Sequence, residues 1–438
     1  MTPGGPHRSA DERAAKPRAI VIGGSLGGLF AANMLWQVCG WEVDLYERVD
    51  DDLASRGAGI ATHDEMFDVL RSLGLPVDES FGIDVTRRIC FGKSGDIVYE
   101  YPMRRKMSAW SRFYRPLKDH FPQDRYHFSM SLQAVEQSDD GVIAVFADGT
   151  RVEGDLLIGA DGFRSAVRES IMPEVQPAYC GYIAWRGMVE ESELPAALHA
   201  QIFERPLEGT HGGYDTLHAY GLPEGEFMTI YPVPGHNNDI RRGHRRSNFV
   251  WYHPIDEAGL ADLCTDATGR CHGTQLPPHL IRPDIVRRMS ALAHELFAPQ
   301  IAQLVAMAKQ PFFQAIFDME SPSVVSHRVA LVGDAAFVAR PHVGMGTTKA
   351  ALDARYLTDA INENADLGAA LKQYDAACRK FGGRVVARGR WLGAHIEAQV
   401  RKPRAERTPA ELNHIPFDTL FREVGAALSD IPELAELT

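Results

Sequence analysis

The stretch Arg18-Ala-Ile-Val-Ile-Gly-Gly-Ser-Leu-Gly-Gly28 decides the fold class of this chain. Its first five residues form a short apolar, β-branched run, which is typical of a buried parallel strand. A run of glycines and small residues over 23–28 follows, and residues 29–38 then favour a helix. A second strand is expected over 42–46, directly before Glu47. The stretch therefore predicts a strand–turn–helix–strand unit of an α/β protein.

The glycines of this unit suit the binding of a dinucleotide. Gly23 and Gly28 let the chain turn tightly and approach a pyrophosphate, and the start of the following helix offers free N–H groups. Glu47, about 20 residues beyond the turn, is expected to accept hydrogen bonds from ribose hydroxyls, with Arg48 beside it. Ser25 stands where the motif usually has its middle glycine, and its small side chain still permits close approach. A purely structural turn is the alternative interpretation.

Two further apolar segments end in glycine and aspartate. Residues 155–168 form an apolar run that breaks at Asp161-Gly162. Residues 327–336 form another, which ends at Gly333-Asp334 and leads through a loop over 340–346 into a helix. Ligands of an open α/β sheet gather at the carboxyl ends of its strands, so Asp334 is expected to lie at a binding site.

The glycine turn, Gly159-Ala-Asp-Gly162, and Gly333-Asp334 followed by Pro341-x-x-Gly344-x-Gly346 stand in the order found in one family. With these motifs the chain resembles the FAD-dependent aromatic hydroxylases, the class A flavoprotein monooxygenases. The resemblance covers about residues 18–395. The phrases Tyr182-Ile-Ala-Trp-Arg-Gly187 and Arg340-Pro-His342 are most similar to the branch of the 2,6-dihydroxypyridine 3-hydroxylases.

The resemblance implies FAD as the cofactor and assigns further residues to it. The set it implies is Arg56, Arg115, Asp161, Asp334, Pro341, Gly344 and Gly346. Asp334 would bind a ribityl hydroxyl, and the loop that ends at Gly346 would present N–H groups to the flavin's pyrimidine edge. For Arg56 and Arg115 the alternative is a solvated or ion-paired surface position. For Asp161 the alternative is a structural turn.

The family's activity is the hydroxylation of an activated aromatic or hydroxylated N-heteroaromatic ring, with NADH or NADPH and O2, through a flavin C4a-hydroperoxide. No second glycine-rich strand–helix–strand unit appears in the sequence, which favours a nicotinamide cofactor that binds only transiently as the electron donor. Three other hypotheses remain open. One is an FAD-dependent dehydrogenase or reductase of the same fold without oxygen insertion, and another is a non-catalytic FAD-binding protein. The third is a simple NAD-dependent dehydrogenase, which would use the first glycine turn but has no need of Gly333-Asp334.

The expected architecture is a Rossmann-like FAD-binding domain with an inserted β-sheet substrate domain and a helical C-terminal region. Aromatic and branched runs over 178–190 and 225–233 predict the strands of the inserted sheet. The expected divisions are a disordered tail at 1–17, an FAD-binding domain at 18–80, 105–176 and 320–361, a substrate domain at 81–104 and 177–319, and a helical region at 362–438.

The substrate pocket is expected between the inserted sheet and the flavin, because domain interfaces are common binding sites. The candidate catalytic residues are His63, His342, Tyr214 and His218. The candidate substrate-binding residues are Tyr182, Trp185 and Tyr231. A histidine with a near-neutral pKa is able to take a proton from a substrate hydroxyl. A hydrogen-bonded structural histidine, or an aromatic ring of the core, is the alternative for each.

Composition narrows the partners. The 438 residues include 46 Lys+Arg and 58 Asp+Glu, a net charge of −12, which argues against a nucleic-acid partner. The six cysteines form no CxxC pair, and Cys264, Cys271 and His272 fit no zinc spacing, so we expect a cytoplasmic protein without a metal site. No membrane contact is expected, and a homodimer is possible. The basic run 241–246 is read as a solvated loop, with docking of NAD(P)H phosphates as the alternative.

Overall fold

A mainly parallel sheet carries the glycine motifs at one edge. The computed structural model describes residues 16–51, 53, 59–138, 141–207, 213–401 and 415–438. The sheet has the order β17 (Val325–Ser326), β18 (Val329–Leu331), β10 (Leu156–Gly159), β1 (Arg18–Ile22), β2 (Glu42–Tyr46) and β6 (Tyr126–His127). Within it Ile22 pairs in parallel with both Tyr46 and Gly159, so the carboxyl ends of three strands meet.

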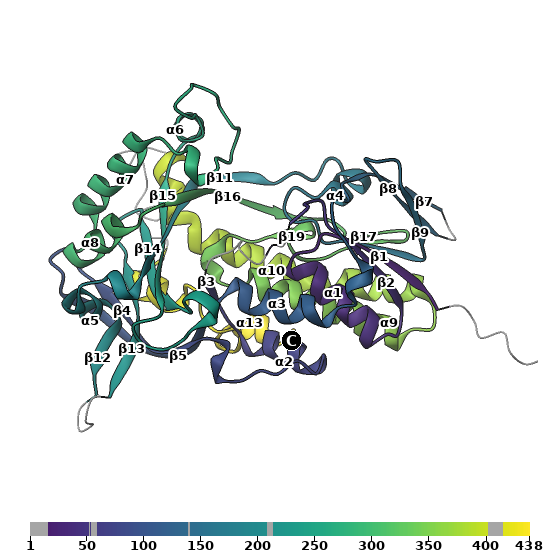
Figure 1. Cartoon of the computed structure of the whole chain (residues 1–438), viewed down its shortest axis with the longest axis horizontal. Coiled ribbons are helices and arrows are strands. Elements are labelled where there is room, and N and C mark those ends of the chain that lie inside the picture. The colour runs from purple at the N-terminus through teal and green to yellow at the C-terminus, as the bar shows by residue number, and fades with distance from the viewer. Residues whose placement is uncertain (1–15, 52, 54–58, 139–140, 208–212, 402–414) are drawn as a thin grey trace, which may run out of the picture.

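Helices and a small sheet cover this parallel sheet. Helices α1 (Leu26–Gln37) and α9 (Gly346–Glu363) pack against each other beneath β1 and β2 in Figure 1, with α3 (Trp110–His120) beside α1. The antiparallel sheet of β7 (Leu132–Gln137), β8 (Val142–Phe146) and β9 (Arg151–Gly154) lies on the other side. The strands between these layers are continuously apolar, as expected for parallel strands buried on both faces.

A second, larger sheet lies beside the first. Its order is β19 (Phe337–Val338), β16 (Phe312–Glu320), β11 (Ala178–Glu190), β15 (Arg246–Pro254), β14 (Phe227–Val233), β13 (Tyr214–Gly221), β4 (Ile83–Phe91), β5 (Ile97–Ala109) and β3 (Gly59–Ala61), with β12 (Glu204–Pro206) paired to β13. The chain passes from β2 of the first sheet directly to β3 of the larger sheet, and α2 (Asp64–Ser72) then separates β3 from β4.

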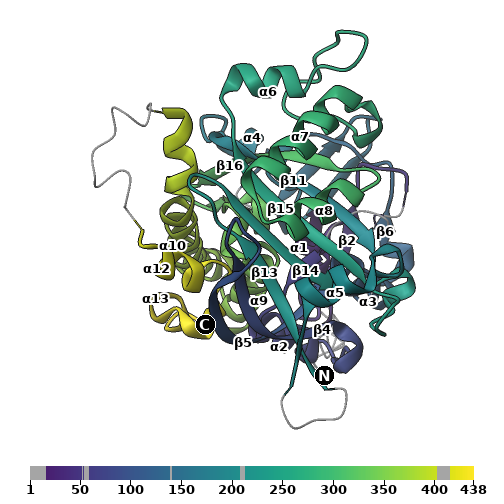
Figure 2. The same ribbon diagram turned by 90° about the vertical axis from the view of Figure 1, so that its left-hand side faces the viewer.

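The larger sheet is covered on both faces by helices. Helices α5 (Ala196–Phe203), α7 (Pro283–Leu296) and α8 (Pro299–Met307) bury one face, and α6 (Glu257–Leu263) lies above them in Figure 2. The long helix α10 (Leu367–Arg401), with α12 (Phe417–Glu423) and α13 (Pro432–Ala435), packs along the other side. Side chains alternate along β11, so Ile183 and Trp185 face α7 and α8 whereas Tyr182 and Ala184 face α10.

Two buried arginines tie the C-terminal segment to the larger sheet. Arg88 on β4 donates to the carbonyl oxygens of Phe421, at 2.9 Å, and Gly425, at 2.8 Å. Arg105 on β5 also donates to the carbonyl oxygen of Gly425. The N–H of Gly425 in turn donates to the carbonyl oxygen of His342 at 3.0 Å. The segment after α12 is therefore fixed against both β4 and the loop that precedes α9.

These observations confirm the predicted α/β class and the helical C-terminal region. The residue limits of the expected domains stay a prediction. Most of the expected tail, residues 1–15, lies outside the described residues. Within the part of the chain that the structure describes, no helix is both long enough and apolar enough to cross a lipid bilayer.

Candidate active site

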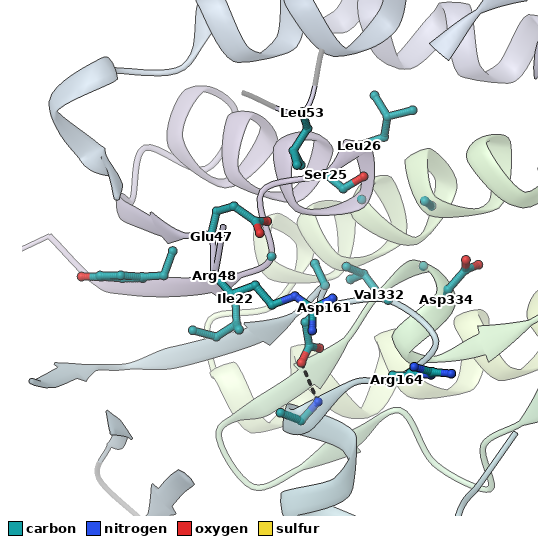
Figure 3. Close-up of a pocket in the computed structure, with 18 of the residues that line it drawn as sticks. Ile22, Ser25, Leu26, Glu47, Arg48, Leu53, Asp161, Arg164, Val332 and Asp334 are labelled. Atoms are coloured by element: carbon teal, nitrogen blue, oxygen red, sulfur yellow. Dashed lines mark hydrogen bonds between the residues drawn. The ribbon is translucent and has the colours of Figure 1, made fainter. Parts of the chain in front are cut away.

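A cavity of about 550 Å³ lies at the carboxyl ends of β1, β2, β10 and β18 (Figure 3). It brings together the three glycine motifs, which are far apart in the sequence. Of the residues singled out from the sequence, those that line it are Gly23, Ser25, Glu47, Arg48, Asp161, Asp334 and Gly346. In Figure 3 Glu47 and Arg48 lie toward one end and Asp334 lies toward the other. The cavity thus matches an elongated ligand that spans the edge of the sheet.

The turn between β1 and α1 requires its glycines. Gly23 has a φ of 108°, and a Cβ on it would lie 2.5 Å from the carbonyl oxygen of Ala160. A Cβ on Gly28 would lie only 1.8 Å from the carbonyl oxygen of Gly23. The carboxylate of Glu47 accepts a hydrogen bond from the N–H of Gly24 at 2.8 Å. Glu47 therefore holds the turn as well as facing the cavity.

Two helices point their amino ends into this cavity. Helix α1 begins at Leu26 and α9 begins at Gly346, and both of these residues line the cavity. No side chain caps either helix, because the N-cap residues Ser25 and Met345 make no capping hydrogen bond. Free N–H groups and the positive ends of the helix dipoles attract phosphate and other anions. The residues present thus fit a dinucleotide cofactor that carries a pyrophosphate.

The turn that carries Asp334 is held by a buried ion pair. The ammonium of Lys349 lies 2.6 Å from the carboxylate of Asp353 and donates to the carbonyl oxygen of Gly333 at 2.8 Å. The same carboxylate accepts from the N–H of Gly333 at 2.8 Å. Burial raises the pKa of Asp334, which faces the cavity with Lys349 nearby. The sequence analysis missed Lys349 and Asp353, although their spacing of four residues on a predicted helix is a pairing signal.

Asp161 caps a helix at the floor of the cavity. Its carboxylate accepts hydrogen bonds from the N–H groups of Ala166, at 2.7 Å, and Val167, at 3.2 Å, at the start of α4 (Ala166–Ile171). Burial raises its pKa, and these hydrogen bonds oppose that rise. Asp161 also lines the cavity, so the structural and the ligand-facing interpretations both hold for this side chain.

Of the two predicted arginines, only Arg115 lies among the residues that the structure describes. Arg56 lies outside the described residues. Arg115 is exposed on α3 and lines neither this cavity nor the one next to it. In contrast Arg164, which the sequence analysis did not single out, lines both. Its position two residues after Gly162, in the second glycine motif, was the available signal.

A second cavity of about 1180 Å³ adjoins the first. The residues that line both are Trp110, Arg164, Asp334, Gly346 and Thr347. The second cavity extends from this junction across the larger sheet to the C-terminal segment, where Val424 and Gly425 form part of its wall. Of the predicted residues, those that line it are His218, Tyr231, Asp334, Pro341, His342, Gly344 and Gly346.

His342 lines the second cavity and has one ring nitrogen without a hydrogen-bond partner among the described residues. Its Nε2 lies 3.0 Å from the hydroxyl of Tyr182, and its Nδ1 is buried without a hydrogen-bond partner. Burial and the nearby Arg340 guanidinium hold the pKa of His342 well below 6.5, so the ring is neutral at pH 7. Tyr182 itself is buried behind His342 and lines neither cavity. The predicted pair therefore forms one unit in which only His342 faces the ligand space.

The other two candidate histidines are held by the protein itself. His63 lines neither cavity, and its nitrogens contact the hydroxyl of Thr348, at 2.8 Å, and the guanidinium of Arg105. His218 lines the second cavity, but its nitrogens contact the hydroxyls of Thr229 and Tyr220. Burial and neighbouring arginines lower the pKa of both histidines well below 6.5. With both nitrogens engaged, neither ring is free to take a proton from a substrate.

Two predicted aromatic residues lie away from both cavities. Trp185 packs edge-on against Phe313 on the face of the larger sheet that α7 and α8 cover. Tyr214 stands at the start of β13, where the guanidinium of Arg242 lies 5.1 Å from its ring centre. Neither lines a cavity, so the predicted substrate contact of Trp185 and the catalytic role of Tyr214 are not supported. The alternation of β11 turns Trp185 outward and Arg186 inward.

The basic run 241–246 makes internal ion pairs. Arg241 contacts the carboxylate of Asp239 at 2.5 Å, and Arg242 contacts that of Glu204 at 2.6 Å. The run is thus a paired surface loop in this structure, in line with the simpler interpretation. Among the described residues no cluster of three or more histidine, cysteine or acidic side chains is arranged to hold a metal ion.

Comparison with known proteins points to flavin enzymes. Residues 16–202 match the family model of an FAD binding domain, and residues 179–318 match an FAD binding domain-like family. The chain is 31% identical to the 2,6-dihydroxypyridine 3-monooxygenase of Paenarthrobacter nicotinovorans, over 82% of this chain and 86% of the relative. It is 28% identical to an FAD-dependent urate hydroxylase of Klebsiella pneumoniae, over 82% and 85%.

A solved structure agrees with this similarity. The structure of 2,6-dihydroxypyridine-3-hydroxylase from Arthrobacter nicotinovorans superposes with a TM-score of 0.78 at 29% sequence identity. The match covers 87% of this chain and 93% of that chain. The arrangement of both sheets, and not only the glycine motifs, is therefore shared.

Proposed function

This chain belongs to the FAD-dependent monooxygenases that hydroxylate aromatic rings, and we propose that its substrate is a small hydroxylated N-heteroaromatic compound of the hydroxypyridine kind. FAD is the cofactor, and NADH or NADPH and O2 are the co-substrates. Support for the substrate class comes from two relatives that act on nitrogen heterocycles, a dihydroxypyridine and urate.

One observation carries the proposal: the cofactor cavity and the second cavity join at Asp334, Gly346 and Thr347. A ring held in the second cavity therefore lies next to the end of the cofactor site that the amino end of α9 faces. FAD, when bound, supplies the redox chemistry with O2. Aromatic side chains, Phe227 and Tyr252 among them, form part of the wall against which a substrate ring would pack.

The chain's own groups perform four tasks. The amino end of α1 would hold the pyrophosphate, and Glu47 and Asp334 would accept hydrogen bonds from hydroxyl groups of the cofactor. With FAD bound, the amino end of α9 would favour negative charge on the part of the cofactor that it faces. The larger sheet orients the substrate. Of the three candidate histidines, His342 is the one that lines the substrate cavity and keeps a ring nitrogen without a partner among the described residues, so we assign to it the acceptance of the proton of a substrate hydroxyl.

The reaction is tested with the purified yellow protein and 2,6-dihydroxypyridine as the first of a set of hydroxypyridines and phenols. We expect the ring compound to accelerate both NAD(P)H oxidation and O2 consumption. With ¹⁸O2, the label is expected in the hydroxylated product. Reduction of the flavin without label in the product would favour a dehydrogenase, and no reduction with any donor would favour a non-catalytic FAD-binding protein.

Location and assembly are further parts of the proposal. The cysteines of the described residues are free thiols, which supports a reducing compartment such as the cytoplasm. A homodimer is proposed without a defined interface, and sedimentation of the holoenzyme measures it. Comparing NADH with NADPH as donors identifies the preferred reductant.

A further inference from the structure

Arg186 lies on β11 in the middle of the substrate cavity wall. Its strand neighbour across the ladder is Val250 on β15, and both line the second cavity together with Met188. These residues share one face of the sheet because side chains alternate along each strand. The guanidinium of Arg186 is half-buried there. It is thus a cation placed where the aromatic ring of a substrate must bind.

This guanidinium has no partner among the residues that the structure describes. It makes no ion pair and no hydrogen bond with them, and its Nε is buried without an acceptor. Two fully buried arginines differ from it in having partners: Arg340 pairs with Asp318 at 2.7 Å, and Arg88 donates to carbonyl oxygens of the C-terminal segment. A half-buried guanidinium that borders a ligand cavity and has no protein partner is stabilised by an anion, so its position suggests an anionic ligand.

The surrounding charge has the sign that an anion needs. Asp334 is the one carboxylate among the described residues that line the second cavity, and it stands at the junction with the cofactor site. Arg105 and Arg88 lie behind His218 and lower its pKa, and carbonyl oxygens rather than carboxylates satisfy them. The substrate end of the cavity therefore has a positive potential.

A hydroxyl donor lies beside Arg186. Tyr252 pairs with Ala184 across β11 and β15, which puts it diagonally next to Arg186 on the same face, and it lines the cavity. Burial raises the pKa of Tyr252 above its ordinary value, although Arg186 opposes the rise, so the hydroxyl stays protonated. It makes no hydrogen bond with any described residue. It is free to donate to the same ligand oxygen.

We infer that Arg186, together with the hydroxyl of Tyr252, binds an anionic oxygen of the aromatic substrate and so selects substrates that bind as anions. This inference rests on the proposed function. The anionic oxygen belongs either to an ionised ring hydroxyl or to a carboxylate, and both accept the charge-assisted hydrogen bonds that a guanidinium donates. A neutral ring of the same size has no group that compensates the charge of Arg186.

The test measures ligand binding to the FAD-loaded protein without NAD(P)H, so it does not depend on turnover. Changes in flavin absorbance or fluorescence give the Kd of each probe. The probes are 2,6-dihydroxypyridine for a ring oxyanion, 4-hydroxybenzoate for a carboxylate, and resorcinol as a neutral ring. Each is titrated at several pH values. We expect affinity for the first probe to rise as that probe ionises.

The variant R186M is expected to weaken binding of the anionic probe by roughly 10- to 100-fold, the range for a lost charged hydrogen bond, and to change resorcinol binding less than threefold. R186K keeps part of the affinity because it keeps the charge. The control R241M, at an exposed and paired surface arginine, keeps all affinities. FAD content and circular dichroism show whether each variant is folded.

Equal losses for neutral and anionic probes in R186M would give Arg186 a structural role and overturn the inference. So would unchanged binding of every probe in R186M, or wild-type protein that binds resorcinol as well as the anions. Preference for 4-hydroxybenzoate over 2,6-dihydroxypyridine identifies the carboxylate as the anion. If anions bind through Arg186 but no ¹⁸O enters any product, the proposed function fails and this inference stands.

Discussion

Asp334 shows how one residue links the two cavities, because it lines both and its turn is held by the Lys349–Asp353 pair. We expect D334A to weaken FAD binding by roughly tenfold or more, since a lost hydrogen bond to a charged group costs about 1.5–3 kcal/mol. The ratio of flavin to protein absorbance after ultrafiltration measures the loss. Full yellow occupancy in D334A would contradict a role in holding the cofactor.

His342 and Tyr182 make a second prediction at this scale. H342A removes an imidazole that lines the substrate cavity but no group of the cofactor cavity, so we expect hydroxylation to fall roughly 10²- to 10⁴-fold while FAD stays bound. The rate of substrate hydroxylation is compared with the flavin content. H63A is the matched comparison, because His63 lines neither cavity. A larger loss of coupled turnover in H63A than in H342A would remove His342 as the base.

Single residues are where sequence reasoning was least complete. Glu47 and Asp334 were predictable because each follows a recognisable strand at the edge where ligands of α/β sheets gather. Trp185 and Arg186 were not distinguishable, because the strand was recognised without knowing which face the helices cover. The pairing of His63 with Thr348 and Arg105 joins segments far apart in sequence. No local sequence pattern predicts such a contact.

At the scale of elements, the turn between β1 and α1 makes a paired prediction. G28A forces a methyl group to within 1.8 Å of a backbone oxygen, whereas a Cβ on Gly27 would meet only the Cβ of Ala350, at 3.7 Å. We expect G28A to lose FAD binding and several degrees of thermal stability, because backbone cannot give way cheaply. G27A should have a much smaller effect on both. Thermal melting and flavin content check both, and equal behaviour would contradict this account.

The main elements could be predicted because their sequences are clear runs of apolar residues. The first strand, the helix after it and the strand before Asp334 follow directly from uninterrupted apolar runs. Pairing of strands was less accessible. The short strand β3 joins the edge of the larger sheet by pairing with β5, some 50 residues later, and nothing within Gly59–Ala61 encodes that partner.

At the scale of the whole molecule, three buried neutral histidines make stability depend on pH. The pKa values of His63, His218 and His342 lie well below 6.5 in the folded state. Below about pH 6.5 the unfolded chain therefore binds protons that the folded protein does not, so acidification lowers the free energy of unfolding. Each histidine contributes up to about 1.4 kcal/mol per pH unit.

Urea unfolding between pH 7.5 and about 5 measures this slope. H342Q removes one titrating group, so its stability should fall less steeply with acid than that of the wild type. H236Q is the control, because it replaces a histidine that is mostly exposed rather than buried. Stability that is constant down to pH 5 would contradict the assignment of neutral, buried rings.

The overall fold was predictable because the ordered motifs are specific to one arrangement, and the second cavity was not. That cavity collects residues from β11, β13, β14, β15, the loop before α9 and the segment after α12. Its wall at Val424 and Gly425 depends on a chain segment whose sequence carries no motif. Only the folded topology brings these pieces together.

The position of Gly425 in the cavity wall has a consequence for the order in which parts of the chain become available to pack. A ribosome makes the chain from its amino end, so the glycine turns and both sheets exist before residues 421–425 leave it. Until then Arg88 and Arg105 lack the carbonyl oxygens that they bind in the finished protein. The segments that line the cofactor cavity are thus all synthesised before the segment that completes the wall of the substrate cavity. The substrate cavity is therefore enclosed only after residues 421–425 dock onto the two arginines.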